Sequence, residues 1–298
     1  MFAFSAMNTE VLVVSPQNEE AVASRVARTF ADAERRFSRF REDSELSALN
    51  RASGPFVASA ELFEVLERAR VYVELTEGLF DPGVGAALEA LGYDRSFEPG
   101  ALDRRSATMP PPTKRFSDVI LEAKTRTVWR PQQLKIDLGG LVKGRTVDHA
   151  ARHLGTAGAI DAGGDARLLG VAPSGESWLV DIEDPSDASR ILASVAATDV
   201  AVATSATNRR RWRVGDTSLH HLIDPRTQRP STSDLQQATV FAPTTELADV
   251  LAKTALLLGV RSARAFLERR SDVGAVLITQ TGRLHFVGAV DVREVSHG

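Results

Sequence analysis

The stretch "KIDLGGLVKGRTVDHAARHLGTAGAIDAGGDARLLG", from Lys135 to Gly170, decides how the chain is interpreted. It predicts a strand over "LKIDL", a helix over "LVKGRTVDHAARHL", and then strand, glycine turn and strand over "GAIDAGGDARLLGVA". Each of its two glycine pairs follows an aspartate, and Lys143 comes just after the first pair.

The first glycine pair, Gly139-Gly140, lies between a strand end and a helix start. Backbone N–H groups at such a junction can converge on an anion, and Lys143 can add a full positive charge. The spacing fits neither G-x-x-x-x-G-K-[ST] nor G-x-G-x-x-G. Phosphate binding and two tight turns with Asp137 as a helix cap are therefore equally good interpretations of these residues.

The composition bounds the class of protein. The 298 residues, 43% of them hydrophobic and 25% charged, suit one large or two modest globular domains. The net charge of −3 gives no reason to expect nucleic acid or an anionic membrane as a partner. The absence of cysteine excludes thiolate catalysis, disulfides and cysteine metal sites. The opening residues lack a signal-peptide pattern and no segment suits a transmembrane span, so we expect a cytoplasmic protein.

Along the whole chain, strands outnumber helices and many neighbouring strands look antiparallel. Strands are expected over 9–15, 177–184, 190–205 and 236–243, and hairpins over 116–131 and 273–289. Amphipathic helices are expected over 16–40, with Asn18 as cap, and over 59–78, 245–259 and 262–270. Residues 41–54 read as a turn, and 97–113 as a Pro- and Ser-rich surface insertion. The fold class is therefore α+β, with largely antiparallel sheets and packed helices in one domain over 1–298.

A second polar block follows the predicted strand that ends in Thr204-Ser205. Alternate strand residues share a face, so its arginines should divide between two faces: Arg209, Arg211 and Arg213 on one, and Arg210 with Trp212 on the other. A charged edge strand explains the arginines most simply. His221 lies near a strand end, where catalytic groups often occur. A structural histidine is nevertheless the commoner case, and Asp224 gives only modest support for a general base.

The apolar helix expected over 245–259 carries Asp249 and Lys253 four residues apart. An ion pair on an exposed helix face is one interpretation of this spacing. A hard-cation ligand is the other, because Mg²⁺ usually takes one or two carboxylates together with phosphate oxygens. With no second acid nearby in the sequence, the ion pair is favoured.

Taken in this order, the blocks resemble the FAD:protein FMN transferase family, also called ApbE. The resemblance runs over nearly the whole chain and rests on these blocks: "FSRFREDSELSALN", "GLFDPGVGAALEALGYD", "IDLGGLVKGRTVD", "AIDAGGDARLLG", "VATSATNRRRW", "HLIDPRTQRP" and "LADVLAKTALLLG". It implies an α+β fold of two lobes around a central cleft that holds FAD. It also implies that, with Mg²⁺, a Thr or Ser hydroxyl of an acceptor flavoprotein attacks the FMN-side phosphorus, so that AMP leaves and FMN stays bound by a phosphoester.

The resemblance also implies roles for individual residues. The residues expected to act in catalysis are His221, Asp249 and Lys143. Those expected to bind FAD are Phe80, Asp81, Gly139, Gly140, Lys143, Thr204, Ser205 and His221. The expected metal ligands are the carbonyl of Gly140 and the carboxylate of Asp249.

Three positions depart from the family pattern. Lys253 stands where a threonine metal ligand is usual, so whether the protein binds Mg²⁺ is left as an open question. The next residue, Thr254, points about 100° further round the helix and is a poor substitute. Gly83 and Ala206 replace a usual threonine and glycine. Two alternatives to flavin transfer therefore stay open, namely hydrolysis of FAD to FMN and AMP, and FAD binding without chemistry.

Overall fold

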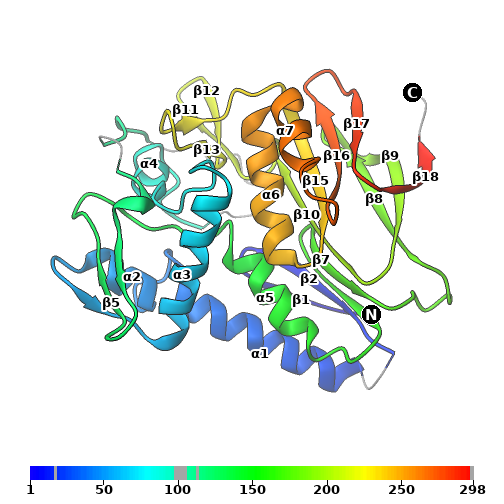
Figure 1. Ribbon diagram of the computed structural model, residues 1–298, viewed down its shortest axis with the longest axis horizontal. Coiled ribbons are helices and arrows are strands. Elements are labelled where there is room, and N and C mark those ends of the chain that lie inside the picture. The colour runs from blue at the N-terminus through cyan, green and yellow to red at the C-terminus, as the bar shows by residue number, and fades with distance from the viewer. Residues whose placement is uncertain (17–18, 97–105, 112–113, 296–298) are drawn as a thin grey trace. The chain divides into compact units, whose positions relative to one another are not determined.

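The computed structural model describes residues 1–16, 19–96, 106–111 and 114–295 (Figure 1). The chain forms two compact units. Unit 1 comprises Met1–Ala31, Lys143–Asn208 and Thr232–Gly298, and unit 2 comprises Asp32–Val142 and Arg209–Ser231. The predicted cap Asn18 and most of the predicted insertion, 97–105 and 112–113, lie outside the described residues.

Unit 1 is built on an eight-stranded sheet whose paired neighbours are all antiparallel. Its strands, in spatial order, are β1 (Phe2–Ala6), β2 (Thr9–Val14), β6 (Gly158–Ala162), β7 (Asp165–Leu169), β10 (Val200–Ala206), β15 (Leu235–Ala242), β16 (Gly274–Thr279) and β17 (Leu284–Val287). A second antiparallel sheet has the order β18 (Asp291–Val295), β9 (Asp187–Ala197) and β8 (Trp178–Asp184). The predicted α+β class with largely antiparallel sheets is confirmed.

The period-two pattern of the strands divides the core of unit 1 into two layers. On one face of the large sheet, Val11 and Val13 of β2 pack with α1 (Glu19–Phe37) and α5 (Val142–Ala151). On the other face, Val202 and Phe241 pack with residues of β8 and β9. Helix α6 (Thr245–Leu258) contacts β10 and β15, and α7 (Val260–Leu267) follows it beside β16 (Figure 1).

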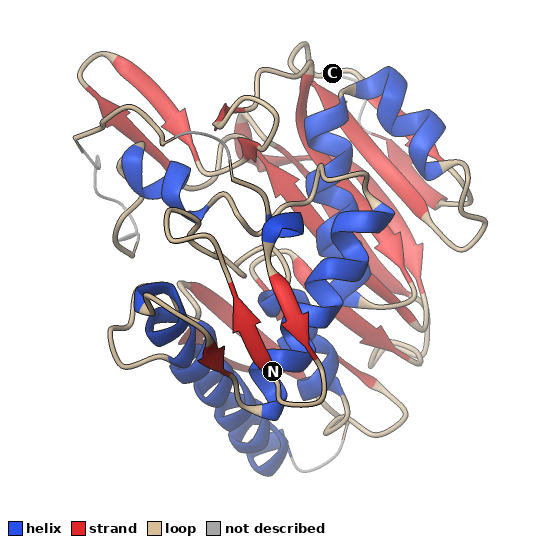
Figure 2. Cartoon of the chain, turned by 60° about the vertical axis from the view of Figure 1, so that its left-hand side comes forward, coloured by secondary structure: helices blue, strands red, loops and turns tan. Residues whose placement is uncertain are grey.

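Unit 2 contains short helices, a small sheet and two hairpins. Its helical elements are α2 (Glu45–Arg51), α3 (Ala60–Leu75), α4 (Gly85–Ala90) and the 3-10 turn η1 (Phe116–Asp118). The sheet has the order β3 (Phe56–Val57), β5 (Thr127–Trp129) and β4 (Ile120–Glu122), and the hairpins are β11 (Arg211–Val214) with β12 (Thr217–His220) and β13 (Ile223–Asp224) with β14 (Arg229–Pro230). Figure 2 colours these elements by type. Trp212 is fully buried between exposed Arg211 and Arg213, so the predicted alternation is confirmed for these three residues. The faces predicted for Arg209 and Arg210 are wrong, because both residues precede β11 and Arg210 has a φ of 49°.

The N-terminal region differs from expectation at two points. Strand β1 was not expected and forms a hairpin with the expected strand over 9–15, because Met7 and Asn8 both have positive φ, 50° and 60°, and reverse the chain. The segment expected as a turn over 41–54 contains helix α2. Ser44 caps this helix by accepting a hydrogen bond from the N–H of Ser47, which satisfies a donor at the helix start.

The prediction of one continuous strand over 190–205 is also wrong. The chain breaks there into β9 and β10, which belong to different sheets. Asp199 lies between them with a φ of 51°, a left-handed conformation that ends the first strand. Strand β18, after the predicted closing hairpin, was not expected. Within the described ranges, no helix combines the length and the apolar character that crossing a bilayer requires.

Candidate active site

A buried charge cluster in unit 1 contains two of the predicted catalytic residues. Lys143, in the first turn of α5, donates a hydrogen bond from Nζ to the carbonyl of Ala162 at 3.2 Å and forms an ion pair with Asp165. Asp165 begins β7 and is 1% exposed. Asp249, on α6, is 7% exposed, so the interpretation that placed it on an exposed helix face is wrong.

The two carboxylates of this cluster influence each other. Burial and, after it, the neighbouring Asp249 carboxylate raise the pKa of Asp165 to about 7, although Lys143 opposes the rise. Within the described part of the chain, Oδ2 of Asp249 is buried and has no hydrogen-bond partner. A buried carboxylate oxygen in this state is unfavourable unless a cation or a donor reaches it. The cluster is therefore suited to binding a positive charge.

The second glycine pair lies directly beside this cluster. Gly164, with a φ of 93°, accepts a hydrogen bond at its carbonyl from the N–H of Thr204 at 3.0 Å. The hydroxyl of Thr204 lies 2.9 Å from that of Thr239, and Ser205 is buried. The structure thus places Thr204, a predicted FAD-binding residue, against the turn that leads into Asp165.

Helix α5 fixes the position of α6 through two residues of the "VKGRTVD" motif, its glycine Gly144 and its aspartate Asp148. Both carboxylate oxygens of Asp148 accept hydrogen bonds from the first turn of α6, from the N–H groups of Thr245 and Glu246, at 2.9 Å each. An anion at a helix N-terminus satisfies otherwise unpaired donors. Gly144 permits this contact because a Cβ there would lie 2.5 Å from the carbonyl oxygen of Thr245. One helix therefore sets the positions of both Lys143 and Asp249.

Replacing Gly144 with valine should lower the free energy of unfolding by about 1–3 kcal/mol, because the added carbons meet backbone atoms that no rotamer change can move. Urea unfolding of the purified variant measures this change. Gly54→Val is the control, since a Cβ at Gly54 meets nothing within 4 Å. Equal stability of the two variants would contradict a tight contact between α5 and α6.

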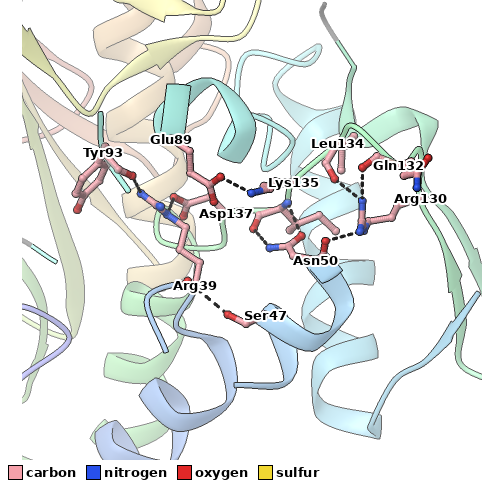
Figure 3. Close-up of polar contacts among 11 residues, drawn as sticks. Arg39, Ser47, Asn50, Glu89, Tyr93, Arg130, Gln132, Leu134, Lys135 and Asp137 are labelled. Carbon is pink, nitrogen blue, oxygen red and sulfur yellow. Dashed lines mark hydrogen bonds and ion pairs between the residues drawn. The ribbon is translucent and has the colours of Figure 1, made fainter. Parts of the chain in front are cut away.

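In unit 2, a buried ion pair fixes the first glycine pair (Figure 3). The Nε of Arg39 donates to Oδ2 of Asp137 at 2.6 Å, and Oδ1 of Asp137 accepts the N–H of Gly139 at 2.7 Å. Arg39 also donates to the carbonyl of Tyr93 at 2.7 Å. Asp137 thus stabilises the turn itself, as the tight-turn interpretation predicts, although the bond goes to Gly139 rather than to a helix. Phosphate binding by this turn stays a prediction.

Asn50 and Arg130 hold the segment that leads into the same turn (Figure 3). The strand predicted over "LKIDL" is wrong, because this segment makes only an isolated β-bridge, between Lys135 and Val84. The amide of Asn50 exchanges two hydrogen bonds of 2.8 Å with the backbone N–H and carbonyl of Ile136. The guanidinium of Arg130 donates to the carbonyls of Leu49 and Leu134, at 3.0 and 2.7 Å. Neither Arg39, Asn50 nor Arg130 was predicted as a site residue. The "SELSALN" block could have indicated Asn50, because Asn50 is its last residue.

Two predicted FAD-binding residues lie in the core of unit 2. Phe80 is 2% exposed and packs edge-to-face on Tyr72, with ring centroids 6.3 Å apart. Asp81 accepts the N–H groups of Gly83 and Phe116 at 2.7 and 3.0 Å, and burial raises the pKa of its carboxyl group. Both residues therefore shape the local backbone, and their contact with FAD stays a prediction.

The predicted base His221 is half-buried and lies between β12 and β13. The neighbouring Asp224 is bound by the guanidinium of Arg226, whose Nη2 lies 2.7 Å from Oδ2 of Asp224. The predicted site residues therefore divide between the units. Unit 1 carries Lys143, Thr204, Ser205 and Asp249, and unit 2 carries Phe80, Asp81, Gly139, Gly140 and His221. The structure brings Lys143 and Asp249 into one cluster, and convergence of both groups on one FAD stays a prediction.

Comparisons with known proteins agree with this picture. The profile of the ApbE family matches residues 7–277. A protein of Treponema pallidum named FAD:protein FMN transferase is 30% identical over 84% of this chain and 75% of its own. One of the same name from Klebsiella pneumoniae is 26% identical over 94% and 90%. Among solved structures, the ApbE protein of Thermotoga maritima has a TM-score of 0.85 and the flavin transferase ApbE of Vibrio cholerae one of 0.79. Each is 23% identical and covers 96% of both chains, which supports the fold.

Proposed function

The chain belongs to the ApbE family, and on that premise we propose that it transfers FMN from FAD to a threonine or serine hydroxyl of an acceptor protein. The observation that carries the proposal is the cluster of Lys143, Asp165 and Asp249. It combines an ammonium group with a carboxylate oxygen that has no hydrogen-bond partner among the described residues, and a diphosphate with its counter-ion needs both kinds of charge. The named relatives support the same activity.

The proposed reaction makes one P–O bond and breaks another. The acceptor oxygen bonds to the FMN-side phosphorus, the bond from that phosphorus to the bridging oxygen breaks, and AMP leaves with that oxygen. The hydroxyl proton passes to the imidazole of His221, acting as general base. Lys143 supplies positive charge to the phosphate oxygens, because such transfers depend mainly on positioning and charge stabilisation.

Magnesium fits one part of the cluster. The buried, unpartnered oxygen of Asp249 is a suitable ligand, and Mg²⁺ is commonly bound by one or two carboxylates plus phosphates. Within the described residues, no group of three or more His, Asp or Glu side chains could hold a metal. When bound, the ion would neutralise negative charge on the phosphates. This proposal includes the binding of Mg²⁺, with the Gly140 carbonyl as one of its ligands. It also includes a cytoplasmic location.

The test is to incubate the protein with FAD, Mg²⁺ and candidate acceptor proteins, and to search for FMN on Thr or Ser by mass spectrometry. The proposal expects a covalent flavin together with one AMP per modified site. Catalytic release of AMP without any acceptor would instead identify an FAD pyrophosphatase. Tight FAD binding without AMP under every condition would identify a binding protein.

Replacing Lys253 with threonine should make the activity more sensitive to Mg²⁺. Lys253 lies one turn after Asp249 on α6 and is half-buried, so its ammonium repels a cation near Asp249. Loss of one like charge at this range is worth about 1–2 kcal/mol, which lowers the half-saturating Mg²⁺ concentration about tenfold. Lys253→Met separates the charge from the added hydroxyl ligand. An unchanged Mg²⁺ titration in both variants would show that Lys253 does not oppose the metal.

A further inference from the structure

The hairpin β11–β12 has one buried face and one exposed face. Trp212 and Leu219 are paired across the two strands and pack in an apolar cluster with Leu88 of α4 (Figure 1). Arg211 and Arg213 alternate with Trp212 along β11, so they lie on the opposite face, and both are exposed. The hairpin is therefore anchored by its apolar face and presents two arginines on the other.

The exposed face carries positive charge that the hairpin does not balance. Arg211 is paired across the strands with His220, and Arg213 with Ser218, so no acid lies opposite either arginine. The one aspartate of the hairpin is Asp216 in the turn, with its Oδ1 at 3.9 Å from Nη2 of Arg213. Within the described part of the chain, Arg211 has no ion-pair partner. Its guanidinium group is thus available to a carboxylate from outside the chain.

An excess of positive charge extends over the whole segment of unit 2 from Arg209 to Ser231. This segment has six arginines against two aspartates, whereas the entire chain has a net charge of −3. Both aspartates already lie near an arginine, Asp216 near Arg213 and Asp224 at 2.7 Å from Arg226. Single charges are enough to protect an edge strand from pairing, and that role does not require an excess of one sign. A surface patch of one sign attracts a partner of the other sign.

We propose that the exposed face of β11–β12, which we call the arginine face and define by Arg211 and Arg213, is the docking surface for an acidic segment of the acceptor protein. A guanidinium group matches a carboxylate because it can offer two parallel N–H donors to the two oxygens. His221 directly follows β12, so a segment bound on the arginine face brings its hydroxyl close to the predicted base. Naming the acceptor as the partner rests on the proposed function, whereas the recognition of carboxylates does not.

Nucleic acid, the other polyanion that arginine recognises, suits this face less well. Proteins that bind single strands stack the bases on exposed aromatic rings. The one tryptophan of the hairpin, Trp212, is turned into the core and is only 1% exposed. The net charge of −3 also gives the chain no general attraction for a phosphate backbone. An acidic protein segment is therefore the partner that fits the arginine face.

The test measures peptide binding to the full chain without FAD or acceptor. The probe is a fluorescein-labelled peptide of alternating aspartate and serine, whose fluorescence anisotropy reports binding at low ionic strength. Arg211→Glu/Arg213→Glu should bind it about tenfold more weakly than the parent, because attraction at two positions becomes repulsion. The same variant should bind a peptide of alternating lysine and serine more tightly than the parent does. Arg211→Gln/Arg213→Gln should lie between the two, and circular dichroism checks that each variant is folded.

Arg41→Glu/Arg70→Glu is the matched control, because it changes the net charge equally at two other arginines of unit 2. Their side chains are 46% and 45% exposed, compared with 44% for Arg213, and each already pairs with an acid. This variant should bind the aspartate peptide almost as the parent does. If it lost as much affinity as the reversed arginine face, net charge and not a docking surface would explain the binding.

Three further results would overturn the proposal. The first is equal affinity of the parent and Arg211→Glu/Arg213→Glu for the aspartate peptide. The second is tighter binding of the parent to an oligothymidylate with the same number of charges. The third is a loss of FAD affinity in the reversed variant, which would assign these arginines to nucleotide phosphates. Since peptide binding needs no transfer reaction, absence of flavin transfer leaves the arginine face standing, and failure of peptide binding leaves flavin transfer untouched.

Discussion

Replacing His221 with alanine should lower kcat for FMN transfer by about 10²- to 10⁴-fold and leave FAD affinity nearly unchanged. A general base acts on the acceptor hydroxyl in the transition state and contributes a factor of this size, whereas it adds little to ground-state binding of the nucleotide. Single-turnover formation of covalent flavin measures the rate, and quenching of flavin fluorescence measures the affinity for FAD.

His220→Ala is the control for this prediction, because the adjacent histidine has a structural role. The Nδ1 of His220 accepts the N–H of Leu222 at 3.3 Å, so its Nε2 carries the proton and donates to the carbonyl of Ser231 at 3.1 Å. Burial lowers the pKa of His220, which keeps the ring neutral. This variant should lose stability and keep its rate when folded. A normal rate in His221→Ala would remove that residue from the chemistry.

The sequence predicts those parts of the fold that depend on local periodicity. Alternating apolar residues predict β2 and the closing hairpin β16–β17, and three- and four-residue spacing predicts α1 and α6. Helix α2 is missed because it has only seven residues and depends on the cap at Ser44, so its periodic signal is weak. The break at Asp199 is missed because the residues on both sides continue one apolar strand pattern.

The candidate site is predictable only where a motif carries it. Lys143 and Asp249 were found because each belongs to a block of the family. Asp165 lies in the Gly-Gly-Asp turn, but its importance appears only when β7, α5 and α6 are placed together. Arg39 and Asp137 are 98 residues apart, and nothing in either local sequence indicates that they pair. Contacts between distant segments arise from the tertiary fold, and a single sequence does not encode them in its periodicity.

The pair of Arg39 and Asp137 should contribute more to stability than any exposed ion pair of the chain. Arg39→Met should lower the free energy of unfolding by about 3–5 kcal/mol, because it removes the guanidinium group from a buried carboxylate. The two side chains are only 6% and 14% exposed, so solvent cannot replace the guanidinium. A loss of this size is a large share of the roughly 5–15 kcal/mol that stabilises a typical domain. Urea unfolding provides the measurement.

Arg41→Ala is the matched control, because Arg41 forms an ion pair of 2.9 Å with Asp43 on the surface of the same segment. Water screens that pair, so the variant should unfold almost as the parent does. In Arg39→Met/Asp137→Asn, no uncompensated charge remains and asparagine can still accept the N–H of Gly139, so part of the lost stability should return. If Arg39→Met were no less stable than Arg41→Ala, the buried pair could not be what holds the first glycine turn in place.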